Sequence, residues 1–220
     1  SGKLQSKTEN TPLLEVRNLK KYFPIYKGIL HKEVNQVRAV DDVSLYIREG
    51  ETLGLVGESG CGKSSLARAI IGLQPTAAGV LRFEGQALGQ MDASAFTRYR
   101  RAVQMVFQDA VGSLNPRMTV RKTLEEVLRV HQMCAPLRIP ARVRELLDRV
   151  GLPETVLDAY PRELSGGQCQ RVSFARCLAL EPRLIIADEP VSALDVSVQA
   201  RILNLVRALQ KELNLTVLLI

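Results

Sequence analysis

The architecture of this chain follows from one motif, Gly57-Glu58-Ser59-Gly60-Cys61-Gly62-Lys63-Ser64. It matches the pattern G-x-x-x-x-G-K-[S/T] of a phosphate-binding loop. Residues 52–56 form a short apolar run that predicts a buried strand before the motif, and residues 63–72 predict a helix after it that ends at Gly72. Because this loop requires a strand before it and a helix after it, a chance glycine-rich turn is a poor alternative.

The residue types of the motif suit the binding of a polyphosphate. The glycines allow the backbone to fold tightly, so that successive N–H groups point at phosphate oxygens, and the following helix adds a favourable dipole. Lys63 would reach the β- and γ-phosphates of a nucleotide, and the Ser64 hydroxyl would bind Mg²⁺. The nucleotide-binding residues predicted in this loop are Gly57, Glu58, Ser59, Gly60, Cys61, Gly62, Lys63, Ser64 and Ser65.

A pair of carboxylates follows a second apolar run, Leu184-Ile185-Ile186-Ala187. Asp188 ends this predicted strand, from where its carboxylate can bind Mg²⁺ directly or through water. Glu189 points elsewhere and would polarise an attacking water molecule. Alone, the two residues would also suit a solvated turn or a helix start at Pro190, but their place behind a buried strand and downstream of a phosphate loop favours catalysis.

The composition is that of an ordinary globular protein, since the 220 residues are 46% hydrophobic and 24% charged. No apolar run reaches the roughly 18 residues of a membrane-spanning helix, and residues 1–11 lack the apolar core of a signal peptide. We therefore expect a cytosolic chain that is attached to a membrane only through partners. The net charge of +7 is scattered, residues 98–101 indicate a solvated helix end, and tryptophan is absent, so nucleic-acid binding is disfavoured.

Strand and helix patterns alternate around a stretch that is helical throughout, which predicts an α/β fold with a mostly parallel sheet and helices on both faces. Residues 24–36 between the first two strands indicate an exposed loop, and the second strand has a break at Asp41-Asp42. The predicted strands are 13–19, 37–47, 52–56, 80–83, 104–107, 184–187 and 215–220. The predicted helices after the loop are 119–132, 141–150 and 198–213.

Two further motifs carry a family resemblance. Leu164-Ser165-Gly166-Gly167-Gln168 opens a helix that Ser165 can cap, with glycines that allow close backbone approach. Ser192-Ala193-Leu194-Asp195 follows the carboxylates. With the phosphate loop they resemble the ATPase subunits of ABC transporters. The resemblance implies ATP and Mg²⁺ as ligands and a second ATPase subunit, because the first motif, the signature, covers the nucleotide of the other subunit, and the second, the D-loop, crosses the interface between them.

The same resemblance assigns three more residues. Gln108 follows the strand 104–107 as the glutamine of the Q-loop does, which implies contact with Mg²⁺ or with the attacking water; the alternative is an ordinary loop amide. Phe23, or else Tyr22, lies where the family places a ring beneath adenine. The predicted catalytic residues are therefore Glu189, Gln108 and Lys63, and the predicted metal ligands are Ser64, Gln108 and Asp188.

The fold that the resemblance implies is a RecA-like P-loop NTPase core with a small antiparallel β layer and an inserted helical subdomain. We expect one ABC ATPase domain over residues 1–220. Within it we expect a flexible N-terminus at 1–12, the β layer and the first half of the core at 13–108, the helical subdomain with the signature at 109–180, and the second half of the core at 181–220.

The segments 113–120, 160–163 and 195–199 are similar to the ATPases of oligopeptide, dipeptide and nickel importers. This branch implies permease subunits in the membrane, an indirect link to a solute-binding protein, and a place on the cytoplasmic face of the bacterial inner membrane. Residues 110–112 depart from the usual proline-and-aromatic stretch.

Three alternatives remain open at this stage. The chain ends at Ile220, before the place of the family's catalytic histidine, so we expect a truncated chain that binds ATP but hydrolyses it slowly, or a nucleotide-binding module without turnover. A DNA-repair type of ABC ATPase is disfavoured, because the spacing from Lys63 to Ser165 leaves room for a helical subdomain but not for a long coiled coil. An exporter ATPase is disfavoured by family resemblance alone.

Overall fold

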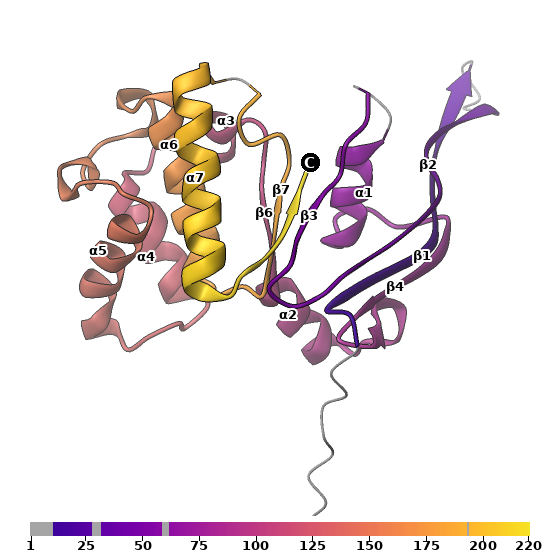
Figure 1. The fold of residues 1–220 in the computed structure, drawn as a ribbon, viewed down its shortest axis with the longest axis horizontal. Helices are drawn as coiled ribbons and strands as arrows, with labels where there is room; N and C mark the ends of the chain where they lie inside the picture. Colours follow the sequence, from indigo (N-terminus) through magenta and orange to yellow (C-terminus); the bar gives the residue numbers. More distant parts are fainter. Residues whose placement is uncertain (1–10, 28–31, 59–61, 193) are drawn as a thin grey trace, which may run out of the picture. The chain divides into compact units, whose positions relative to one another are not determined.

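The computed structural model describes residues 11–27, 32–58, 62–192 and 194–220, with residues 23–27 and 32–38 described as backbone only. The chain divides into two compact units (Figure 1). Unit 1 comprises residues 1–49 and 59–96, and unit 2 comprises residues 50–58 and 97–220. Each unit has a sheet of its own, antiparallel in unit 1 and parallel in unit 2, as the predicted fold class requires.

The sheet of unit 1 has the strand order β2-β1-β4-β5. Its strands are β1 (Leu14–Lys27), β2 (Lys32–Ile47), β4 (Ala78–Phe83) and β5 (Gln86–Ala87). Leu14, Leu19 and Ile47 are fully buried in this unit. The helix α1 (Lys63–Ile70) contacts β2, and its buried face carries Leu66 and Ile70. A short 3₁₀ helix, η1 (Leu88–Gln90), follows the sheet.

The exposed loop predicted at 24–36 is wrong over its described part, because β1 and β2 continue through it and pair as far as Lys27 opposite Lys32. Main-chain hydrogen bonds hold such a ribbon together whatever its side chains, so the side chains of this stretch did not reveal it. The predicted break at Asp41-Asp42 is confirmed as an irregularity in this pairing. Asp42 has a φ of 56°, and Asn18 Nδ2 donates to Asp42 Oδ1 at 2.8 Å.

The sheet of unit 2 is parallel, with the strand order β3-β8-β7-β6. Its strands are β3 (Thr52–Gly54), β6 (Val103–Val106), β7 (Leu184–Ala187) and β8 (Thr216–Leu219). All residues of β7 are buried, as its continuous apolar run predicts. The prediction that 52–56 forms a buried strand is wrong in its burial, because β3 is an edge strand whose residues are half-buried or exposed.

The helices of unit 2 form a group around one hydrophobic core. They are α3 (Ala110–Ser113), α4 (Val120–Val130), α5 (Ile139–Arg149), α6 (Gly166–Leu178) and α7 (Val196–Leu213), with 3₁₀ turns η2 (Pro136–Arg138), η3 (Glu154–Val156) and η4 (Pro161–Glu163). The helix α2 (Ala93–Ala102) begins in unit 1 and contributes no residue to this core. Figure 1 shows α4, α5 and α6 side by side. The core includes Leu124, Leu128, Leu146, Leu147 and Phe174.

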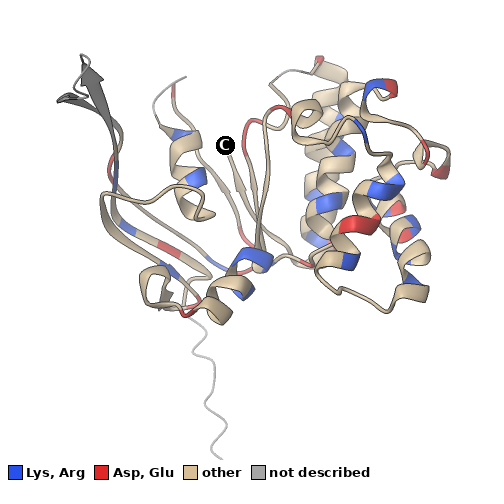
Figure 2. Ribbon diagram, turned by 180° about the vertical axis from the view of Figure 1, so that it is seen from behind, with Lys and Arg blue, Asp and Glu red and all other residues tan. Residues whose placement is uncertain are grey.

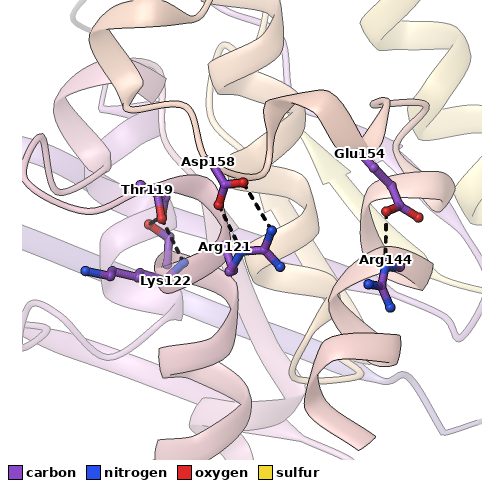
Figure 3. A network of polar contacts seen from close by, with 7 residues as sticks. Thr119, Arg121, Lys122, Arg144, Glu154 and Asp158 are labelled. Carbon is purple, nitrogen blue, oxygen red and sulfur yellow. Dashed lines mark hydrogen bonds and ion pairs between the residues drawn. The ribbon is translucent and has the colours of Figure 1, made fainter.

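Polar contacts on the surface fix the ends of these helices (Figure 3). Thr119 caps α4 by accepting from the Lys122 N–H, and Arg121 donates to both oxygens of Asp158 at 3.0 and 3.3 Å. The hydrogen bond from Arg121 lowers the pKa of Asp158. Arg144 donates to Glu154 at 3.1 Å. Because these pairs are exposed, each contributes little to the stability of the fold.

Charges of both signs are interspersed along the helices of unit 2 (Figure 2). The basic cluster 98–101 lies at the end of α2, as predicted, but Tyr99 within it is buried rather than solvated. Over the described residues, no helix is both long enough and apolar enough to cross a bilayer.

Candidate nucleotide site

The phosphate loop ends in unit 1 at the start of α1. Gly62 precedes the helix with a φ of 93°, and a Cβ placed on it would lie 1.6 Å from the carbonyl oxygen of Ala39. Only glycine accepts both this left-handed conformation and this close approach of the backbone. The motif therefore requires Gly62 for packing against β2 as well as for the turn. Ser59, Gly60 and Cys61 lie outside the described residues.

The first turn of α1 suits an anionic ligand. It carries no acidic residue, and no described side chain caps it. Lys63, Ser64 and Ser65 are half-buried there. The N-terminus of a helix attracts anions through its N–H groups and its dipole, and Lys63 adds a formal positive charge. Gly57 and Glu58 are exposed residues of unit 2.

The two carboxylates of unit 2 are held at the end of β7. The Asp188 N–H donates to Val106 O at 3.0 Å, and the Glu189 N–H donates to Ile220 O at 3.0 Å. Asp188 is 3% exposed, whereas Glu189 is half-buried. Glu189 has a φ of 44°, a conformation that non-glycine residues adopt rarely and mostly where the surrounding structure enforces it. The main-chain hydrogen bonds of Asp188 and Glu189 thus fix the position of the Glu189 backbone and, with it, the direction of its side chain.

Gln108, Glu189 and Ser192 form one hydrogen-bonded cluster. Gln108 Nε2 donates to Glu189 Oε2 at 3.0 Å and to Ser192 Oγ at 3.1 Å. Ser192 Oγ in turn donates to Glu189 O at 3.2 Å. The three residues come from three separate motifs, and the sequence did not predict that Gln108 would contact Glu189. In this arrangement the amide of Gln108 engages the carboxylate that is the candidate general base.

The signature opens α6 as predicted. The Gln168 N–H donates to Ser165 Oγ at 3.2 Å, and the Ser165 N–H donates to Gln168 Oε1 at 2.9 Å, so that the two residues form a capping box. A Cβ on Gly167 would lie 2.6 Å from Val198 Cγ1, and one on Gly166 would lie 3.2 Å from Leu194 Cδ2. The glycines thus allow the start of α6 to pack closely on the D-loop and the start of α7. Leu164, before the cap, is half-buried against the core.

Replacing Ser165 by alanine is expected to lower the free energy of unfolding by about 1 kcal/mol, because the Gln168 N–H loses its acceptor. Thermal unfolding should show this as a shift of about 2–4 °C. Ser165→Asp is the matched control, since aspartate also caps helices and should keep most of the stability. Equal stability of the wild type and Ser165→Ala would show that the cap is unimportant.

The D-loop is shaped by Asp195, which caps α7. Its Oδ1 accepts from Ser197 Oγ at 2.7 Å and from the Val198 N–H at 3.0 Å. Both hydrogen bonds lower the pKa of Asp195, and the bond from Ser197 has the larger effect. Gln199 Nε2 donates to Leu194 O at 2.9 Å, which ties the loop to the helix. Ala193 lies outside the described residues.

The aromatic residues predicted to stack on adenine lie in β1. The Phe23 side chain is outside the described part of the chain. Tyr22 is half-buried, and its hydroxyl donates to Asp41 Oδ1 at 2.7 Å. This bond gives Tyr22 a structural role in the ribbon, so Phe23 remains the favoured residue for stacking.

The predicted metal ligands come from both units, and their joint binding of Mg²⁺ stays a prediction. Asp188, Ser64 and Gln108 offer a carboxylate, a hydroxyl and an amide oxygen, which are the hard oxygen donors that Mg²⁺ prefers. Within the described ranges, there is no group of three or more His, Cys, Asp or Glu residues that could hold a metal ion.

Comparison with known proteins gives consistent matches. The family model described as ABC transporter matches residues 40–192. The oligopeptide transport ATP-binding protein AppF of Bacillus subtilis is 49% identical, over 94% of this chain and 64% of its own. OppF of Escherichia coli is 47% identical, over 94% and 63%, and the glutathione import protein GsiA of Pectobacterium atrosepticum is 48% identical, over 95% and 34%. The chain thus spans less than two thirds of the length of these relatives.

Two solved structures are similar over almost the whole chain. One is the dimeric post-hydrolysis state of the ATP-binding cassette MJ0796 bound to ADP and Pi, with a TM-score of 0.80 and 29% identity over 94% of this chain and 86% of that one. The other is cbiO1 from Clostridium perfringens, with a TM-score of 0.77 and 27% identity over 96% and 78%.

Proposed function

Since the chain belongs to the ABC transporter family, we propose that it binds and hydrolyses ATP to drive the import of peptides or a related small solute. Relatives named for oligopeptide transport and glutathione import support this choice of solute. The observation that carries the proposal is the contact of Gln108 with Glu189 and Ser192, because it joins three family motifs at the end of the parallel sheet. The carboxyl ends of parallel strands are where α/β proteins bind their ligands.

In the proposed reaction, the phosphate loop binds the triphosphate, with Lys63 on the β- and γ-phosphates. Asp188, Ser64 and Gln108 would hold Mg²⁺, which neutralises charge on the phosphates when bound. Glu189 accepts a proton from water as the water oxygen bonds to the γ-phosphorus. The bond from that phosphorus to the bridging oxygen breaks, and the products are ADP and phosphate.

We further propose that two ATPase subunits close on the nucleotide, with the signature of each facing the ATP of the other. The dimeric state of a solved relative supports this arrangement. The second subunit is another copy or a related chain. Permease subunits would transmit the motion, a solute-binding protein would deliver the solute, and the chain would lie at the cytoplasmic face of the bacterial inner membrane.

One observation favours a second candidate, a nucleotide-binding module that does not turn over. Gln108 Nε2 donates a hydrogen bond to the carboxylate of Glu189 at 3.0 Å. A general base that already accepts this hydrogen bond is less available to accept a proton from water. The two candidates share ATP binding and differ only in hydrolysis.

ATP affinity and phosphate release, measured on the wild-type chain and on Lys63→Ala, test the proposal. We expect ATP binding by the wild type, a loss of about 10-fold or more in affinity for Lys63→Ala, and turnover that depends on Mg²⁺. Binding without turnover would favour the second candidate. Absence of binding by a folded wild-type chain would contradict both.

A further inference from the structure

A side chain buried in unit 2 lacks the hydrogen bond that its amide requires. Gln170 lies in the second turn of α6 and is 2% exposed, and its Nε2 has no hydrogen-bond partner among the described residues. Buried amides are nearly always hydrogen-bonded, because an unpaired one gives up water without compensation. The Nε2 group of Gln170 can therefore still donate to an acceptor.

Gln170 borders a hollow of about 340 Å³ that lies within unit 2. The lining also includes the segment from Gln108 to Val111, together with Pro190, Leu194 and Gly166. The hollow thus brings Gln170 together with the Q-loop, the signature and the D-loop. It offers room for a side chain of one of these segments to move.

The segment from Gln108 to Ser113 is hydrogen-bonded to α6 at its C-terminal end. Arg176 Nη1 donates to Ser113 O at 2.8 Å, and the hydroxyls of Ser113 and Ser173 lie 3.3 Å apart. At the near end, Gln108 is exposed, and its Nε2 is engaged by Glu189 and Ser192. No described residue donates to Gln108 Oε1. Gln108 and Gln170 therefore line the same hollow, and the buried amide nitrogen of Gln170 has no acceptor among the described residues.

We propose that Gln170 is a positioning residue that competes with Glu189 for the side chain of Gln108. In the structure the Gln108 side chain donates to Glu189. In the alternative conformation that we propose, it turns into the hollow, and its Oε1 accepts a hydrogen bond from Gln170 Nε2. An amide oxygen has two lone pairs, so this bond leaves one for a metal ion. The exchange gives Gln170 its missing acceptor and frees the carboxylate of Glu189.

The consequence for catalysis rests on the proposed ATPase function. Glu189 accepts a proton from water only when Gln108 no longer donates to it. Gln170 therefore sets the fraction of molecules in which the base is available, without touching the nucleotide itself. Its removal should lower kcat and leave the KM for ATP nearly unchanged, because the triphosphate is bound by the phosphate loop and not by Gln170.

The test replaces Gln170 by methionine, which has a similar length and no amide. We expect kcat to fall about 10-fold, with the KM for ATP within about twofold. The midpoint of thermal unfolding should rise by about 2–4 °C, because an unpaired buried amide is removed. The matched control is Gln210→Met: Gln210 is half-buried, and its Nε2 donates to Gly50 O at 2.6 Å, so this change should lower the midpoint and leave kcat unchanged.

The side-chain NH₂ signal of Gln170 provides a readout that does not need turnover. In the spectrum of the ¹⁵N-labelled chain it is assigned by its loss in Gln170→Met, and we expect it to move downfield when Mg²⁺ and a non-hydrolysable ATP analogue bind. An unmoved signal with an unchanged kcat overturns the inference while the ATPase proposal stands. A midpoint that falls as in Gln210→Met also overturns it, and a folded wild type that binds no ATP refutes the ATPase proposal together with this inference.

Discussion

Replacing Glu189 by glutamine is expected to reduce ATP turnover by about 100-fold or more while leaving ATP affinity within about threefold. Glutamine keeps the size of the side chain but cannot accept a proton from water. Its Oε1 can still accept the hydrogen bond that Gln108 now donates at 3.0 Å, so the local structure should be preserved. Phosphate release under saturating ATP and titration with a fluorescent nucleotide would measure the two quantities separately.

Glu181→Gln is the matched control for this change. Glu181 is exposed and accepts from Arg142 at 2.8 Å. It precedes β7, whereas the carboxylate pair follows that strand, so its replacement should leave turnover unchanged. If Glu189→Gln retained at least a third of the wild-type turnover, Glu189 would not be the general base.

Replacing Gly62 by alanine is expected to weaken ATP binding by about 100-fold or more, which corresponds to roughly 2.7 kcal/mol. The added Cβ would lie 1.6 Å from Ala39 O, and the φ of 93° is unfavourable for any residue with a Cβ. The start of α1 therefore has to move, and with it Lys63 and Ser64. Isothermal titration with ATP and Mg²⁺ would measure the loss, and thermal unfolding should show a lower midpoint.

Gly89→Ala is the control for the glycine substitution, because nothing lies within 4 Å of a Cβ at Gly89. It should leave both ATP affinity and stability unchanged. An affinity of Gly62→Ala within about threefold of the wild type would mean that the loop tolerates a shifted helix start, contrary to the geometry at Ala39.

The elements that the sequence predicted best are those whose signals are local. Residues 184–187 form β7 with the predicted bounds, because a strand between two others in a parallel sheet is apolar throughout. The N-terminal caps of α6 and α7 were equally recognisable from the sequence. The side chains of Ser165 and Asp195 each accept a hydrogen bond from the N–H group three residues ahead. Gly62 was predicted from the turn it makes, but its contact with Ala39 was not.

The predictions that failed depend on pairing and on the order of strands. The ribbon at residues 24–27 and 32–36 is held by main-chain hydrogen bonds, which do not depend on the pattern of side chains. The exposure of β3 follows from its place at the edge of the sheet, which depends on where β8 lies.

The sequence by itself determined the chemical groups of the site: a phosphate loop, two adjacent carboxylates, a capped signature and a Q-loop glutamine, each defined by residues close together in the chain. The tertiary structure decided how these groups pair. Gln108 meets Glu189 and Ser192 across 81 and 84 positions, and Gln170 is buried without a partner beside the same segment. Propensities and caps act over a few residues, whereas these contacts arise only when parallel strands and the packing of α6 bring distant segments together.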